Sequence, residues 1–204
     1  MEKKYSISIP SPLGSNRERH IAFLTPEYPH PNVTHAAGIG TSIKNLTAAL
    51  ANEGVAVTVF VYGQQTQGIS IENGIAIHLI KHRKYKYLGW YFHRKHIERY
   101  CNSIIKKEKI DLLEAADWTG ITAFHGSDTY FCYLEQRQQK LKNFWFEKLA
   151  TLGANAFIAP TNFAAEVSKK LFRIKNKKIL TIHYGLDLTQ FENIAPESKV
   201  SGKV

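Results

Sequence analysis

Short apolar runs that alternate with amphipathic segments are the feature that most limits how this chain can fold. The run VAVTVFVY at residues 55–62 is rich in β-branched residues, and it follows a segment at 42–53 whose apolar residues recur at helical spacing. Strands that are apolar along their whole length are typical of parallel sheets covered by helices on both faces. Because crossovers between parallel strands are right-handed, the pattern predicts an α/β domain with a Rossmann-like, doubly wound parallel sheet.

The same reasoning assigns the other elements. We expect strands at 20–25, 55–62, 75–80, 111–115, 156–160 and 179–183. We expect helices at 42–53, 90–107 and 135–152, and a last helix that Asn162 caps and that ends near Phe172.

One connection is shorter than this fold requires. A parallel crossover needs roughly a dozen residues or more, and the stretch between the strand at 111–115 and His125 is shorter than that. Either residues 121–124 form the next strand and a helix is lost, or the sheet lacks one central strand.

Length, cysteine content and the ends of the chain bound its class. The 204 residues suffice for one large α/β domain or two small ones, and the two cysteines give no disulfide framework, which fits a reducing compartment. Residues 1–20 lack the apolar core of a secretory signal, and no apolar run is long enough to span a membrane. We therefore expect a soluble cytoplasmic protein with a flexible tail at 1–19, one domain at 20–191 and a frayed end at 192–204.

A glycine pair precedes the first expected helix. Residues 35–44, HAAGIGTSIK, place Gly38 and Gly40 after an irregular loop. Ligands of doubly wound sheets bind at the carboxyl ends of the strands, where amides at a helix N-terminus favour a phosphate or a sugar hydroxyl. The dinucleotide fingerprint is not met, because residues 26–37 intervene and Lys44 stands where a third glycine belongs. An alternative is that the two glycines only form a tight loop.

Four motifs, in order along the chain, resemble one family. They are TPEYPHPNVTHAAGIGTSIK, IDLLEAADWTG, the tetrad HGSD, and ANAFIAPTNF with HYGLD farther on. Over about His20 to Phe191 this order resembles the family-4-type, retaining GT-B glycosyltransferases. The chain departs from the family's pattern where Ala37 replaces the first glycine of G-G-I-G and where Tyr184 stands at a usual asparagine.

The resemblance implies a two-domain enzyme with its active site in the cleft between two Rossmann-like domains. The N-terminal domain mostly binds the acceptor, and the C-terminal domain binds the sugar nucleotide. Carried over to this chain, it implies catalytic roles for His125 and Asp128. It also implies substrate contacts by Glu27, Gly38, Ile39, Gly40, Thr41, Asp117, Trp118, Thr161, Gly185 and Asp187. The family is usually metal-independent, so we expect no metal site and no cofactor, with the nucleotide sugar as substrate.

The resemblance also defines the expected function. The chain would be the acceptor-side domain of an enzyme that moves a hexose from a nucleotide sugar to a sugar or lipid-linked acceptor, with retention, in glycan biosynthesis. Because the donor domain is expected to be absent, we expect the isolated chain to be inactive. Two alternatives remain: a non-enzymatic Rossmann-like binding module, and one subunit of a split glycosyltransferase.

Positive charge gathers in one segment. Of a net charge of +10, residues 81–109 hold ten Lys and Arg and two Glu. One interpretation is a helix with a solvated basic face. The other is docking on an anionic membrane surface, since aromatic and basic residues together suit such an interface and would make the protein membrane-associated. Nucleic acid is not expected as a partner, because no nucleic-acid-binding motif accompanies the charge.

Overall fold

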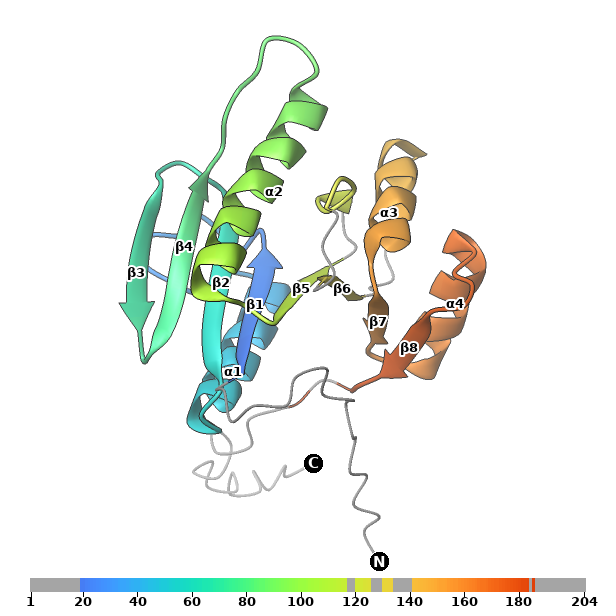
Figure 1. The fold of residues 1–204 in the computed structure, drawn as a ribbon, viewed down its shortest axis with the longest axis horizontal. Helices are drawn as coiled ribbons and strands as arrows, with labels where there is room; N and C mark the ends of the chain where they lie inside the picture. The colour runs from blue at the N-terminus through green and yellow to red at the C-terminus, as the bar shows by residue number, and fades with distance from the viewer. Residues whose placement is uncertain (1–18, 117–119, 126–129, 134–140, 184, 186–204) are drawn as a thin grey trace, which may run out of the picture.

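The computed structural model of the chain describes residues 19–116, 120–125, 130–133, 141–183 and 185. These residues form an eight-stranded sheet in the order β3-β4-β2-β1-β5-β6-β7-β8, with helices packed against it (Figure 1). All neighbouring strands in this order are parallel except β3 and β4, which are antiparallel. The predicted Rossmann-like, doubly wound α/β fold is confirmed.

The first half of the chain follows the predicted alternation closely. Its elements are β1 (His20–Thr25), α1 (Gly38–Asn52), β2 (Ala56–Gln64), β3 (Gly68–Glu72) and β4 (Ile75–Lys81). Helix α1 begins at Gly38 rather than at residue 42, so both glycines of the pair lie in its first turn. Gly54 follows the helix with φ +77°, a left-handed conformation that glycine adopts without strain.

Strand β3 was not predicted from the sequence. It pairs with β4 through a hairpin in which Asn73 and Gly74 have φ angles of 51° and 80°. Positive φ at both central residues is the geometry of a type I′ turn, which Asn-Gly favours. The Asn-Gly pair was therefore the signal for this hairpin. Apart from this turn, the sequence of β3 gives only a weak strand signal, because its two apolar residues, Ile69 and Ile71, point away from the core.

The second half contains one further strand that the prediction did not place. Its elements are α2 (Gly89–Glu108), β5 (Leu112–Ala116), β6 (Tyr130–Tyr133), α3 (Leu141–Gly153), β7 (Ala156–Ala159), α4 (Asn162–Phe172) and β8 (Lys178–Thr181). Helix α4 is capped by Thr161 rather than by Asn162, since the hydroxyl of Thr161 accepts a hydrogen bond from the amide of Ala164 at 3.0 Å.

The short connection is resolved by the position of β6. Residues 121–124 form a turn instead of a strand, and β6 follows His125 rather than preceding it. The crossover from Ala116 to Tyr130 then has the length of roughly a dozen residues that a parallel connection needs. The central strand whose presence the sequence left open is therefore β6, which lies between β5 and β7.

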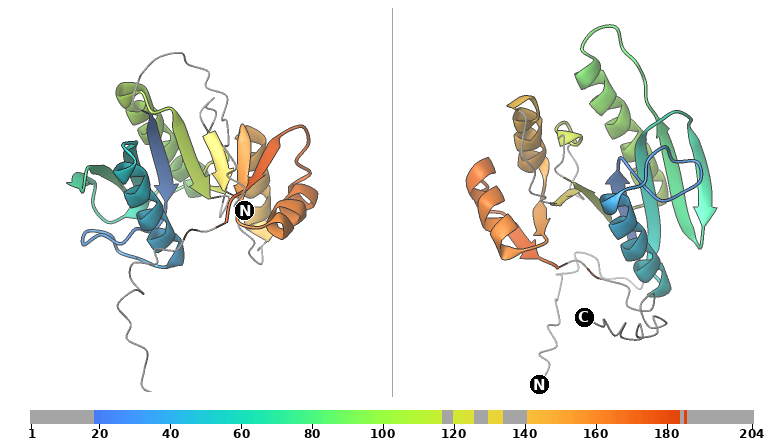
Figure 2. Two further views of the ribbon diagram at one scale, coloured as in Figure 1. Left: turned by 90° about the horizontal axis from the view of Figure 1, so that it is seen from below. Right: turned by 180° about the vertical axis from the view of Figure 1, so that it is seen from behind.

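Two apolar cores lie on opposite faces of the sheet. One lies under α1 and contains Phe23, Val59 and Ile77. The other lies under α2, α3 and α4 and contains Leu24, Ile97 and Phe157. Figures 1 and 2 show α1 and α2 on opposite sides of β1 and β2. At β1 and β2 the sheet is therefore buried on both faces, which accounts for the unbroken apolar sequences of these two strands.

We predict that Lys177 stabilises the end of α3. Its ammonium donates hydrogen bonds to the carbonyl oxygens of Thr151, Leu152 and Ala154 at 3.2, 2.7 and 2.6 Å. Substitution Lys177→Ala is expected to lower the free energy of unfolding by about 1–2 kcal/mol, because helix-end carbonyls lose a charged donor. The exposed Lys175 provides a control, and Lys175→Ala is expected to change it by less than about 0.5 kcal/mol. Urea denaturation of both variants measures the difference, and equal losses would contradict the capping role.

Candidate functional site

The loop that follows β1 is fastened at both ends by one buried side chain. Gln64, at the carboxyl end of β2, accepts hydrogen bonds through Oε1 from the amide and hydroxyl of Thr34, both at 3.2 Å. Its Nε2 donates to the carbonyl oxygens of Pro26 and Tyr62 at 3.4 and 3.0 Å. Residues 26 to 34 are therefore anchored to the carboxyl edge of the sheet.

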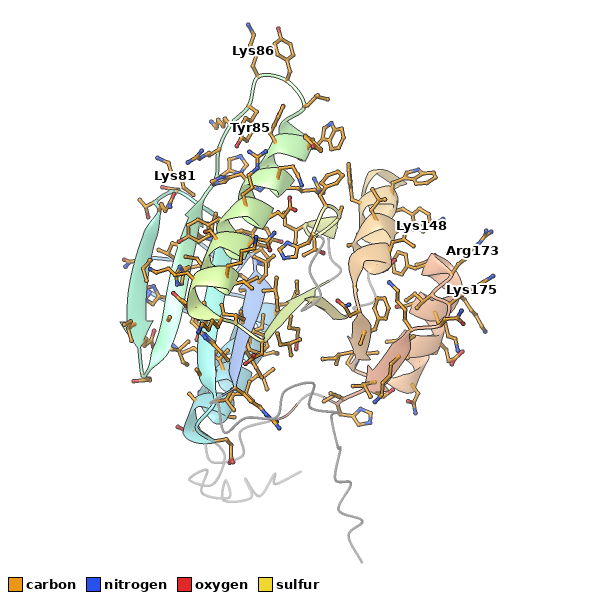
Figure 3. The ribbon with its side chains drawn as sticks, in the orientation of Figure 1. Lys81, Tyr85, Lys86, Lys148, Arg173 and Lys175 are labelled. Atoms are coloured by element: carbon orange, nitrogen blue, oxygen red, sulfur yellow. The ribbon has the colours of Figure 1, made fainter. Side chains whose placement is uncertain are left out.

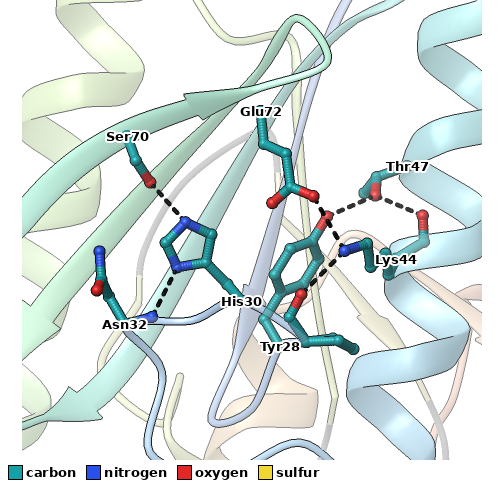
Figure 4. A network of polar contacts seen from close by, with 8 residues as sticks. Tyr28, His30, Asn32, Lys44, Thr47, Ser70 and Glu72 are labelled. Atoms are coloured by element: carbon teal, nitrogen blue, oxygen red, sulfur yellow. Dashed lines mark hydrogen bonds and ion pairs between the residues drawn. The ribbon is translucent and has the colours of Figure 1, made fainter.

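A second set of polar contacts ties the same loop to α1 and β3 (Figure 4). Lys44 donates to the carbonyl oxygen of Pro29 and pairs with Glu72, both at 3.0 Å. On the other side of the loop, His30 Nε2 lies 3.2 Å from the hydroxyl of Ser70. Together with Gln64 of β2, these contacts connect the loop to three elements and fix its position.

The carboxylate of Glu27 occupies the N-terminus of α1. The amides of Ile39 and Gly40 donate hydrogen bonds to Glu27 Oε1 at 3.1 and 3.2 Å. The residue before the helix, Ala37, has no side chain that could cap it. A carboxylate at the positive end of the helix dipole satisfies two of the amides that a helix start leaves open. Glu27, Ile39 and Gly40 are therefore brought together as one unit.

The two glycines of the pair have different roles. A Cβ on Gly40 would lie 3.0 Å from the carbonyl carbon and oxygen of Glu27, so the loop backbone packs directly on the helix there. A Cβ on Gly38 would meet nothing within 4 Å. Gly38 and Thr41 are exposed, and the hydroxyl of Thr41 donates to the carbonyl oxygen of Ala37 at 3.1 Å. Gly40 is thus a packing residue, whereas Gly38 faces solvent.

A second group of predicted residues lies at the carboxyl ends of β7 and β8. Thr161 is exposed, and its hydroxyl is used as the cap of α4. The two strand ends are joined by hydrogen bonds from Thr181 to Asn162 at 2.7 Å and between His183 and the Pro160 carbonyl at 2.8 Å. Gly185 follows and is exposed. Among the described contacts, no hydrogen bond connects this group with Glu27 and α1.

His125 is buried between helices, in the crossover that leads to β6. Its amide donates to the carbonyl oxygen of Thr122 at 2.8 Å, and its own carbonyl abuts Gly153 so closely that a Cβ there would lie 2.8 Å away. Burial lowers the pKa of His125 to about 4, and the nearby Glu98 and Lys95 of α2 act in opposite directions. The imidazole is therefore neutral near pH 7. Its predicted catalytic role stays a prediction.

Arg94 is a positioning residue that sequence reasoning missed. Its side chain is buried, and Nε donates to the carbonyl oxygen of Gly120 at 2.9 Å. The guanidinium lies 4.0 Å from the ring centroid of Phe146 on α3. Arg94 therefore ties α2 to the crossover and to α3. The signal for it was weak, because an arginine in a basic helix is normally solvated.

Glu114 is an ionisable group inside the sheet. It lies on β5 in register with Phe23 of β1, on the face that α1 covers elsewhere. Burial raises the pKa of its carboxyl to about 7. Near neutral pH this group therefore changes charge inside the fold.

Four predicted site residues, Asp117, Trp118, Asp128 and Asp187, lie outside the described residues, as do residues 1–18 of the predicted tail. Within the described part of the chain, no group of three or more His, Cys, Asp or Glu side chains is arranged to hold a metal ion. None of the helices searched in that part is both long and apolar enough to cross a membrane.

Comparison with known proteins now adds to this geometry. Residues 36–190 match the family model described as Glycosyltransferase Family 4. The structure is similar to sucrose-phosphate synthase from Thermosynechococcus elongatus, with a TM-score of 0.63 and 16% identity, over 84% of this chain and 49% of that chain. UGT73P12 of Glycyrrhiza uralensis, complexed with glycyrrhetinic acid 3-O-monoglucuronide, follows with a TM-score of 0.48 and 8% identity over 81% and 49% of the two chains. No curated protein matches the sequence.

At 16% identity, the similarity to the synthase concerns the fold alone. The chain spans about half the length of the solved chains it matches.

We predict that the two glycines of α1 respond in opposite ways to the same substitution. Gly40→Ala is expected to lower the free energy of unfolding by about 1–3 kcal/mol, because the new Cβ forces the Glu27 backbone away. Gly38→Ala has open space and is expected to be neutral or stabilising by up to about 1 kcal/mol, since alanine favours helix. Thermal denaturation, with amide exchange at residues 39 and 40, measures both effects. Similar losses in both variants would show that the close approach at Gly40 is unimportant.

We also predict a pH-dependent gain from Glu114→Gln. Above pH 7 the wild-type carboxylate is charged in the folded and the unfolded state, and its burial is costly. Below the unfolded value of 4.5 it is neutral in both, so the cost vanishes. The variant is therefore expected to be more stable at pH 8 by on the order of 3 kcal/mol, with the difference falling to zero near pH 4. Urea denaturation across this range tests it, and a difference that does not change with pH would refute it.

Proposed function

Because the chain belongs to glycosyltransferase family 4, we propose that it forms the acceptor-side half of an enzyme that transfers a hexose from a nucleotide sugar with retention of configuration. The observation that carries this proposal is the family match over 36–190. It starts before α1 and extends past β8, and so includes nearly every element of the sheet. The similarity to half of a GT-B fold supports the same assignment.

The acceptor site that we propose is centred on the N-terminus of α1. Gly38 and Thr41 are exposed at the helix start, where the dipole favours electron-rich oxygens. The Thr41 hydroxyl already donates to the Ala37 carbonyl oxygen, so its own oxygen would act as an acceptor. The hydrogen bonds described for Glu27 use Oε1 only, so Oε2 can accept one from a sugar hydroxyl. A carboxylate next to a donor amide suits a saccharide, whose hydroxyl groups both donate and accept.

The amides of Ile39 and Gly40 have a supporting role in this proposal. They are already bonded to Glu27, so they orient the carboxylate rather than meeting the donor phosphate directly. We propose that Thr161 and Gly185, which lie beyond the carboxyl ends of β7 and β8, contact the donor, and that Asp187 does so by the family resemblance. His125 and Asp128 follow β5 in the chain, and their place beside the transferred sugar is proposed from the family resemblance alone.

A non-enzymatic binding module is the second candidate. One observation favours it. Of the amides of residues 38–40, those of Ile39 and Gly40 already donate hydrogen bonds to the Glu27 side chain of the same molecule. A subunit of a split transferase would share the acceptor site proposed above but would need a second polypeptide for the donor. Both alternatives differ from the main proposal in what the native protein contains.

The proposal predicts saccharide binding without turnover by the 204-residue chain. Mixed with UDP-glucose, GDP-mannose or ADP-glucose and simple sugar acceptors, these 204 residues are expected to transfer no hexose, because they span only about half the length of the solved chain that they resemble. Amide signals of Gly38 and Thr41 are expected to shift in NMR spectra when an acceptor saccharide is added. Thr41→Val should weaken the shifts, whereas Lys175→Gln, on a distant exposed side chain, should leave them unchanged.

Turnover of any sugar nucleotide by this chain alone would overturn the acceptor-half proposal. A lack of shifts with all saccharides would favour the binding module. The mass of the native protein isolated from its own cells distinguishes a two-domain enzyme from a split one. A denatured mass near twice 23.2 kDa is expected for a two-domain enzyme, and a 23.2 kDa chain in a heavier complex for a split one.

A further inference from the structure

A basic and aromatic tip rises from the carboxyl end of β4. The tip comprises Lys81–Phe92, which is the last residue of β4, the loop that follows it and the first turn of α2 (Figure 1). It contains four basic residues and no Asp or Glu, and all four are exposed: Lys81, Arg83, Lys84 and Lys86. In Figure 3, Lys86 lies at the far end of the loop, with Tyr85 and Lys81 nearer the sheet.

The tip also exposes large apolar side chains next to these cations. The exposed fractions are 72% for Tyr87, 56% for Leu88, 49% for Trp90 and 43% for Phe92. The ammonium of Lys86 lies 5.5 Å from the ring centroid of Tyr87. Single exposed apolar residues are normal, but a contiguous group of them marks a surface that contacts something else.

The start of α2 lacks the features that normally stabilise a helix N-terminus. Leu88 is its N-cap and has a left-handed conformation with φ 49°, and its side chain makes no capping hydrogen bond. Asparagine or glycine would fit both the cap and the conformation better. The first turn contains no acidic residue, although the helix dipole favours negative charge there. A strained, exposed leucine at an uncapped helix start is better explained by an external contact than by the fold.

We propose that this tip docks on the surface of an anionic lipid bilayer. Tyr87 and Leu88 enter the headgroup region, while the four cations contact lipid phosphates. Aromatic and basic side chains mixed on one projecting segment match the two layers of such an interface, apolar below and anionic above. An RNA partner would use the cations but would have no need of an exposed leucine.

The base of the tip is connected to the candidate site. The amide of His82 donates to the carbonyl oxygen of Gln64 at 2.7 Å, and the Gln64 side chain holds the loop after β1. On the other side, Trp90 packs on Phe146 of α3 with ring centroids 5.1 Å apart. A bilayer bound at the tip would therefore lie beside the edge at which we propose that the acceptor binds. This link to a lipid-linked acceptor rests on the proposed function, whereas membrane docking does not, so the two can fail separately.

Vesicle co-sedimentation of the full chain tests the docking. At low salt the wild type is expected to bind vesicles of phosphatidylcholine mixed with phosphatidylglycerol and not vesicles of phosphatidylcholine alone. Each basic residue near an anionic surface contributes a factor of about five to binding. The double variant Lys84→Gln/Lys86→Gln is therefore expected to bind about 25-fold more weakly. The matched control Lys170→Gln/Lys175→Gln removes the same charge from the last turn of α4 and the loop after it, both exposed. Its binding is expected to stay within about twofold, because the effect is local to the tip.

Leu88→Asn gives the most specific outcome. Asparagine suits the left-handed cap, so this variant is expected to melt at a higher temperature than the wild type while binding the anionic vesicles several-fold more weakly. A purely structural role for Leu88 would leave vesicle binding unchanged.

Three results would overturn the proposal. One is equal binding of the wild type to both kinds of vesicle, or binding to neither. Another is an equal loss in the control variant, which would indicate only nonspecific attraction. The third is tighter binding to a fluorescent single-stranded RNA than to the vesicles, with loss of RNA binding in Lys84→Gln/Lys86→Gln but not in Leu88→Asn. That pattern would identify the tip as a nucleic-acid surface.

Discussion

Burial of β1 on both faces is the constraint on which the rest of the structure depends. Ala22 and Leu24 enter the core under α2, while Phe23 enters the core under α1, and all three are almost completely buried. A shift of one residue would exchange the two faces and put Phe23 where the core is packed around Ala22 and Leu24. Close packing on both faces therefore specifies the register of β1. As a result, β1 ends at a defined residue, Thr25, at the carboxyl edge of the sheet.

The fixed end of β1 also fixes where the following loop begins. Thr25 donates its hydroxyl to the carbonyl oxygen of Glu27 at 2.8 Å, which turns the chain back toward α1. Glu27 then reaches the helix start, and the missing side chain of Gly40 permits the contact. Loops of this length are commonly mobile. Here Gln64 and Lys44 hold it at separate points, so the edge of the sheet presents a fixed arrangement of donors and acceptors.

The strands with the clearest sequence signal lie inside the sheet, although the edge strand β8 was predicted as well and the internal strand β6 was not. β1, β2 and β4 are apolar throughout because helices or neighbouring strands surround them, and this signal is local to each segment. β3 was missed since an edge strand needs little apolar sequence. β6 was missed because its placement depends on the length of a crossover. The prediction also put the cap of α4 one residue late, as both Thr161 and Asn162 are good capping residues.

The candidate site was predictable only in part. The sequence indicated that Gly38 and Gly40 begin a helix beside the first strand, and it indicated the family. It did not show that Glu27 binds the helix amides, or that Gln64 and Arg94 position the surrounding loops. Those roles depend on side chains that are distant in sequence and meet only in the folded chain.

The sequence by itself determined the α/β class, the order of most elements and the family, because these follow from local periodicity and from motifs in a fixed order. Only the tertiary structure decided that β6 follows His125 and that the amides of Ile39 and Gly40 are bonded to Glu27. It also decided that Leu88 is exposed at a strained helix start. The physical reason is that each of these depends on which distant groups come into contact, and a linear pattern carries no record of distance in space.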